Sequence, residues 1–164
     1  MAEISFPPVS FLFAVEILGN TGSNSRVEAG FQEVSGIGVE MQTDKIAEGG
    51  QNLFAHKVPS RISNDSNLVL KRGLITTSSV FGDWCRKHFS QGLNTVTKSQ
   101  KIEPKNVIVH LLDVTTQKPI MAWAFANAYP VKWEISGLNA KESNFVVESL
   151  TLAYAYVAVI QPKS

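Results

Sequence analysis

Histidine and cysteine are the residues of this 164-residue chain best suited to chemistry, but their spacing does not favour a reactive centre. His56, His88 and His110 lie far apart, and none is at metal-ligand spacing from another histidine or from Cys85. His88 follows Cys85 closely, yet a catalytic thiol also needs a base and electropositive surroundings. We interpret Cys85 as a small buried hydrophobe. The sequence predicts no catalytic residue, no metal site and no cofactor.

Two glycine-rich stretches and two basic pairs are the remaining candidates for a ligand site. Gly36-Ile37-Gly38 and Glu48-Gly49-Gly50 lack the Lys-Ser/Thr of a phosphate loop, so we interpret them as a bulge and a hairpin tip. Lys71-Arg72 and Arg86-Lys87 are predicted to be solvated strand and helix ends, because a nucleic-acid surface would interleave basic residues with exposed aromatic rings. The chain is therefore not expected to be an enzyme.

Composition favours a subunit of an assembly. The net charge of +1 excludes a global field that would attract nucleic acid or an anionic membrane. The charged fraction of 18% is below the usual ~25%, which suits a chain that buries surface against partners. The first residues lack the features of a signal peptide, and the uncharged run from Ser149 to Pro162 is too short to span a bilayer as a helix. We expect assembly in the cytoplasm of the producing cell.

Hydrophobic periodicity predicts one domain, 1–164, that is mainly β. Short runs with alternating character predict about eight antiparallel strands, with a break at Tyr129-Pro130 and an extended hairpin over about 39–58. One apolar stripe at helical spacing predicts a helix over about 79–90. The expected fold is an antiparallel β-barrel or sandwich with one flanking α-helix. The tryptophans Trp84, Trp123 and Trp133 fall within apolar patterns and are expected to be core or interface anchors.

The stretch 145–160 is predicted to be one strand that is covered on both faces. Its even positions are mostly bulky, including Leu150, Leu152, Tyr154 and Tyr156, whereas its odd positions are mostly small. A strand with one wet face would alternate apolar with polar residues. We therefore expect the subunit's own core to cover one face and another copy of the chain to cover the other.

Several local patterns together resemble a known family. They are Phe31-Gln32-Glu33-Val34-Ser35-Gly36-Ile37, Glu48-Gly49-Gly50-Gln51-Asn52, Leu68-Val69-Leu70-Lys71-Arg72-Gly73-Leu74, Ala128-Tyr129-Pro130-Val131-Lys132-Trp133 and Val147-Glu148-Ser149-Leu150-Thr151-Leu152. In this order they resemble the inner tube (tail tube) protein family of contractile phage tails and phage-tail-like extracellular contractile injection systems. The resemblance implies a tail-tube barrel with a flanking helix, six of which close into a ring, with rings stacked around a lumen.

The resemblance also implies partners and contact residues. The hairpin tip, Glu48, Gly49, Gly50, Gln51 and Asn52, is expected to reach the adjacent ring, and Leu150, Leu152, Tyr154 and Tyr156 are expected in the core or at the contact within a ring. Implied partners are further copies of the chain, a surrounding sheath protein, baseplate and tube-initiator proteins, and cargo in the lumen. The subunit is not expected to insert into a membrane; it would be part of a virion tail or of a released or cell-bound injection particle. The alternatives are a tube-initiator or tail-completion ring and, more remotely, a small-ligand-binding β-barrel.

Overall fold

The computed structural model describes residues 11–18, 26–47, 49–50, 55–63, 65–74, 79–93, 103–136 and 146–161. Within them the chain forms nine strands and one helix. In chain order these elements are β1 (Phe11–Leu18), β2 (Arg26–Ser35), β3 (Glu40–Ile46), β4 (His56–Ser63), β5 (Leu68–Gly73), α1 (Val80–Leu93), β6 (Lys105–Asp113), β7 (Pro119–Ile135), β8 (Val147–Ala153) and β9 (Tyr156–Ile160).

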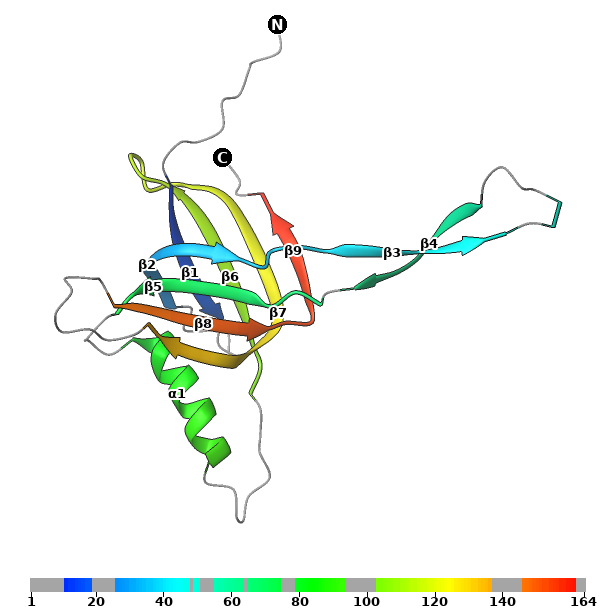
Figure 1. The fold of residues 1–164 in the computed structure, drawn as a ribbon. Coiled ribbons are helices and arrows are strands. Elements are labelled where there is room, and N and C mark those ends of the chain that lie inside the picture. Colours follow the sequence, from blue (N-terminus) through cyan, green and yellow to red (C-terminus); the bar gives the residue numbers. More distant parts are fainter. Residues whose placement is uncertain are drawn as a thin grey trace, which may run out of the picture.

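Six of the strands close into a barrel. The seven-stranded sheet has the order β6-β1-β2-β5-β8-β7-β9, and an additional β6–β7 pairing closes the circle, so that within this sheet only β9 lies outside the barrel (Figure 1). Every pairing is antiparallel. The predicted class, a mainly antiparallel β-barrel with one flanking helix, is confirmed.

The barrel interior is filled by side chains from every second residue along the strands. On β5 the burial pattern alternates strictly, with Leu68, Leu70 and Arg72 inside, and β8 repeats it with Glu148, Leu150 and Leu152. Aromatic rings close the remaining space, because Phe31, Phe81 and Phe125 are all almost fully buried. The period-two alternation in the sequence thus indicates directly which side chains form the core.

Strand β7 is long and bent, and the predicted break at Tyr129-Pro130 is wrong. The strand continues through Pro130, which is a register partner of Leu152 on β8. Proline fits there because the pairing of β7 with β6 has ended at Ala128, so the missing N–H removes no ladder bond on that side. A register shift between Pro130 and Lys132 marks the bend.

The described residues 146–160 form two strands, so the prediction of a single strand over 145–160 is wrong. β8 ends at Ala153 and β9 begins at Tyr156, and between them the Ala155 N–H donates to the carbonyl oxygen of Ala126 at 2.9 Å. The bend in β7 is the physical reason. β8 pairs with the second half of β7, and β9 pairs with the first half. Because β7 bends between these halves, the chain must also bend between β8 and β9.

The helix covers the lower end of the barrel in Figure 1. Ser79 caps its start, because the Ser79 hydroxyl accepts a hydrogen bond from the Gly82 N–H at 3.0 Å. Phe81, Trp84 and Cys85 form its buried stripe. The helix begins at Val80 and extends to Leu93, three residues past the predicted end near residue 90. In the described part of the chain, no helix is long and apolar enough to cross a membrane.

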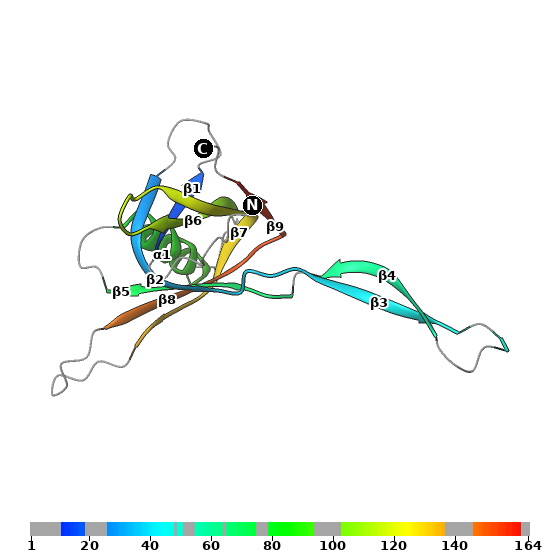
Figure 2. The same cartoon turned by 90° about the horizontal axis from the view of Figure 1, so that it is seen from above.

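Strands β3 and β4 form a separate two-stranded sheet that projects from the barrel (Figures 1 and 2). We expected a hairpin over about 39–58, followed by a polar connection from Ser60. Instead, β4 extends to Ser63, and Ile62 is the register partner of Met41. The polar residues Ser60, Arg61 and Ser63 hid the end of this strand, because a projecting arm is exposed to water on both faces and needs no apolar alternation.

Candidate functional site

The projecting arm spans residues 39–63, and most of its described residues are exposed. Every described residue of β3 and β4 is exposed except Gln42 and Ser63, which are half-buried. Several exposed side chains are apolar: Val39, Met41, Ile46, Val58 and Ile62. An isolated two-stranded hairpin is marginally stable in water. Exposed apolar groups on such an arm therefore favour a role in contact with another molecule.

The predicted inter-ring tip lies at the end of this arm but is only partly described. Gly49 and Gly50 are exposed in the turn between β3 and β4, and Gly50 has φ +92°, which favours glycine. Glu48, Gln51 and Asn52 lie outside the described residues. The assignment of these five residues to an inter-ring contact stays a prediction.

The base of the arm is tied to the barrel by Tyr154. Its hydroxyl is within hydrogen-bond distance of the carbonyl oxygens of Gly36 at 3.1 Å and Gly38 at 3.3 Å, and Tyr154 itself is buried beside Phe125. Burial raises the pKa of the Tyr154 phenol, and the hydrogen bond to Gly38 opposes that shift. The Tyr154 hydroxyl thus connects the barrel core to the segment Gly36–Gly38, from which the arm begins.

Removing this hydroxyl is expected to cost about 0.5–1.5 kcal/mol of unfolding free energy, as for a typical hydrogen bond. Tyr154→Phe should show this loss in urea unfolding at neutral pH. Because the folded state holds the phenolic proton more tightly, the contribution is complete below the unfolded pKa of 10.0 and is lost as pH rises through the higher folded pKa. Wild type and Tyr154→Phe should therefore converge in stability at strongly alkaline pH. An unchanged gap above pH 10 would contradict the assignment.

The four residues predicted for the core or ring contact do not share one environment. Leu150 and Leu152 are fully buried and Tyr154 is 8% exposed, so all three pack in the subunit's own core. Tyr156 is 59% exposed on β9. The chain bends between β8 and β9, so the alternation of faces along β8 does not continue into β9. Tyr156 therefore does not share the inward face of the other three residues.

Strand β9 presents an apolar open edge. Within the described chain it pairs only with β7, and Tyr156, Val159 and Ile160 are all exposed. Two further open edges border the sheet segment formed by β2, β5, β8 and the end of β7. Glu33–Ser35 pair only with β5, and Lys132–Ile135 pair only with β8, among the residues described. Open edges bearing unpaired backbone groups are sites where another chain can add to a sheet.

The outer face of this four-stranded segment is polar and electrically balanced. The register places Glu33, Lys71, Ser149 and Glu134 in one row across the four strands. Lys71 Nζ lies 2.9 Å from Glu33 Oε1, and Lys132 Nζ lies 2.8 Å from Glu134 Oε1. A shallow groove crosses the row; it is lined by Gln32, Glu33, Lys71, Glu134, Ile135, Ser136, Val147 and Ser149. We call it the end groove.

A buried ion pair lies beneath this face. Arg72 Nε donates to Glu148 Oε2 at 2.7 Å, and the guanidinium also donates to the Ser79 hydroxyl at 2.9 Å. Glu148 Oε1 accepts from the Trp133 indole N–H at 2.9 Å, and the Arg72 guanidinium lies 5.3 Å from the Phe31 ring centroid. The network therefore joins β5, β7 and β8 to the start of the helix.

Sequence reasoning missed this network. We predicted that Lys71-Arg72 is solvated, but Arg72 is only 2% exposed, so the prediction is wrong for that residue. The signal was present in the strand parity, because Arg72 shares the inward face with Leu68 and Leu70, and Glu148 shares it with Leu150. A basic and an acidic residue on inward positions of neighbouring strands indicate a buried pair. Arg86 and Lys87, by contrast, are exposed on the helix as predicted.

The remaining chemical candidates lie apart. Cys85 is 1% exposed in the core, His88 lies against Phe89 on the helix, and His110 Nε2 is 3.1 Å from Glu16 Oε2 on the barrel surface. Among the described residues, no group of three or more His, Cys, Asp or Glu side chains is placed to hold a metal. Trp84 packs in the core as expected, and Trp123 is partly buried and packs against the core cluster.

Solved structures of other proteins share this fold. The chain is similar to a protein in the structure of the anti-feeding prophage baseplate, at 24% identity and TM-score 0.73, with 96% of this chain and 98% of the other covered. It is similar to a protein in the sheath–tube complex of the PVC extracellular contractile injection system, at 20% identity and TM-score 0.71, with 97% and 95% covered. Hcp1 from Flavobacterium johnsoniae is more distant, at 12% identity and TM-score 0.52, with 92% and 96% covered.

Sequence comparison identifies the family. No curated protein sequence matches significantly. The sequence profile described as the T4-like virus tail tube protein gp19 matches residues 9–158, which is nearly the whole chain and includes all nine described strands up to the middle of β9. The chain therefore belongs to the T4-like tail tube protein family.

Proposed function

We propose that this chain is the repeating subunit of the inner tube of a contractile tail or injection system. Rings of six copies would stack around a lumen and deliver cargo when a surrounding sheath contracts. The family match over residues 9–158 is the observation that carries this proposal. It is supported by the similarity of the whole chain to proteins solved in a 6-fold symmetrised baseplate and in a sheath–tube complex.

The open edges of the sheet explain how copies would join within a ring. Glu33–Ser35 on β2 and Lys132–Ile135 on β7 border opposite sides of the same four-stranded segment. Pairing the β2 edge of one copy with the β7 edge of the next is a heterologous contact, and such contacts form a ring when the rotation closes. Closure would leave no sheet edge of this segment unpaired. The polar outer face would then form one continuous wall.

The projecting arm supplies the second kind of contact that a tube needs. It extends away from the barrel with exposed apolar side chains, so it can reach a neighbouring ring that the barrel itself does not touch (Figure 1). A rigid tube requires both contacts in every copy, one within the ring and one between rings. We propose that the tip at 48–52 contributes to the second.

The role that we propose is mechanical and not enzymatic. Energy would come from the contracting sheath, and the chain would act as a passive conduit whose partners are further copies, the sheath protein, and baseplate and tube-initiator proteins. Assembly would take place in the cytoplasm before the particle is released or anchored. A ligand-binding barrel is disfavoured, since Phe31, Phe125 and Leu150 fill the barrel interior.

Assembly of the purified chain tests the proposal. We expect wild-type protein to form rings and tubes that are visible by negative-stain electron microscopy, and mass photometry to find hexamers at low concentration. Exposed β-edges and an apolar arm are the physical reason. Monomers alone at high concentration and across salt conditions would contradict the proposal. A tube-initiator would form single rings only, so copy number per particle separates it from a tube subunit.

A further inference from the structure

Two lysines on the projecting arm face each other across its two strands. Lys45 on β3 and Lys57 on β4 are direct register partners, and both are exposed. Cross-strand partners share one face of a hairpin and have Cβ atoms about 4.5–5.5 Å apart, where like charges are destabilising. Within the described residues, no carboxylate makes an ion pair with either lysine. An anionic group bound between the two lysines would therefore relieve their repulsion.

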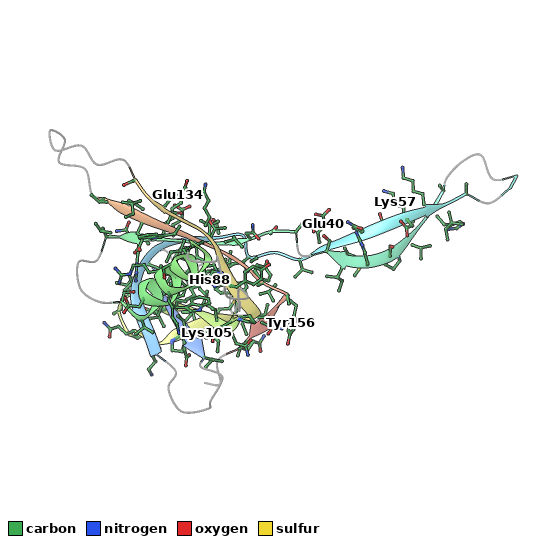
Figure 3. All side chains as sticks on the ribbon, turned by 90° about the horizontal axis from the view of Figure 1, so that it is seen from below. Glu40, Lys57, His88, Lys105, Glu134 and Tyr156 are labelled. Carbon is green, nitrogen blue, oxygen red and sulfur yellow. The ribbon has the colours of Figure 1, made fainter. Side chains whose placement is uncertain are left out.

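Carboxylates lie at the other end of the subunit. Figure 3 shows Lys57 toward the far end of the arm and Glu134 on the opposite side of the barrel. Glu134 and Glu33 both line the end groove. In a head-to-tail stack, the arm of one copy points toward the end of the next copy that carries this groove. The exposed carboxylate of Glu134 thus lies at the end of the subunit that stacking would bring toward the two lysines.

The two carboxylates of the end groove are not equally available. Both oxygens of Glu33 are occupied, because Lys71 Nζ donates to them at 2.9 and 3.0 Å. Glu134 is contacted at Oε1 by Lys132, two residues away, and this side-chain pair is 59% and 57% exposed. Exposed ion pairs of this kind contribute little to stability, so losing one costs little. Glu134 is therefore the carboxylate better able to accept a new partner.

We propose that Lys45 and Lys57 of one copy bind the carboxylate of Glu134 of a second copy in the next ring. This inference rests on the proposed function, and it names the charged contact that fixes how rings stack. Each copy would supply the lysines at one end and the carboxylate at the other, which gives the stack a direction. Because the contact recurs in every copy of a ring, a small loss per contact adds up over the interface.

Charge reversal on the arm tests the lysines. In K45E/K57E the arm would carry two carboxylates toward Glu134, and we expect rings to form while tubes are lost in negative-stain images. The control K87E/K118E makes the same change in net charge at two exposed lysines of the helix and the β6–β7 turn, and it should assemble like wild type. Since Lys45 and Lys57 are exposed, thermal unfolding of the barrel should not change.

Reversal of the partner tests the pairing itself. The triple variant K45E/K57E/E134K restores opposite charges across the contact, and we expect tubes to return. Normal tubes from K45E/K57E would overturn the proposal, and so would a triple variant that forms rings but no tubes. Either result would leave the tube function intact so long as wild type still forms tubes. Failure of wild type to form tubes would instead reject the proposed function.

Discussion

Replacement of Arg72 by methionine is expected to lower the unfolding free energy of the subunit by about 3–5 kcal/mol, the cost of breaking a buried ion pair from one side. Arg72 is 2% exposed, and its guanidinium contacts both Glu148 and Ser79. Its removal leaves the Glu148 carboxylate in the core with only the Trp133 N–H as a hydrogen-bond partner within the described part of the chain. Urea unfolding under conditions that keep the chain unassembled would measure the loss.

Two further variants identify the buried charge as the cause. Lys71→Met removes the neighbouring ion pair, whose side chains are 39% and 54% exposed, and should cost at most about 1 kcal/mol. Arg72→Met combined with Glu148→Gln removes the charge but keeps an oxygen that can accept from Trp133. This double variant should recover much of the stability lost by Arg72→Met. Equal losses of unfolding free energy for Lys71→Met and Arg72→Met would show that breaking the buried pair costs no more than breaking an exposed one.

Replacement of Gly36 by alanine is expected to distort the base of the projecting arm. Gly36 has φ +80°, and a Cβ built there would lie 1.8 Å from the backbone carbonyl oxygen of Asn67. The left-handed conformation alone costs a residue with a side chain about 1–2 kcal/mol, and the contact with Asn67 must be relieved by moving backbone. We expect lower stability in urea unfolding and a loss of stacked rings in electron micrographs.

Gly38 provides the matched control for this position. It lies two residues away on the same connection, its carbonyl also accepts from Tyr154, and a Cβ there would meet nothing within 4 Å. Gly38→Ala should therefore change stability by less than about 1 kcal/mol. If Gly36→Ala assembled tubes as Gly38→Ala does, the position of the arm would not depend on the close approach of Gly36 to Asn67.

Much of the architecture was predictable, because it is encoded in local patterns. The alternation in Phe11–Leu18 and Leu68–Gly73 predicted strands with the bounds that the structure shows. The apolar stripe at 80–89 predicted the helix, since a period of 3.6 differs clearly from the surrounding period of two. The ordered motifs from Phe31 to Leu152 indicated the tail tube family, and the profile match over 9–158 confirms it.

Long-range pairing accounts for what was missed. The bend in β7 depends on which strands lie on either side of it, so neither its passage through Pro130 nor the corner before Tyr156 was readable from neighbours in the sequence. The end of β4 was missed for another reason. An arm exposed on both faces needs no regular alternation of apolar and polar residues, so the polar residues Ser60 and Arg61 hid the continuation of the predicted hairpin arm to Ser63.

The amino-acid sequence alone determined the β class, the strand faces and the family, because these depend on residue type and on spacing within single elements. The tertiary structure decided which charges are buried, where the sheet has open edges, and that the arm and the end groove lie at opposite ends of the subunit. These features arise only when strands far apart in the chain pair. Arg72 and Glu148, separated by 76 residues, become partners only once β5 and β8 lie side by side.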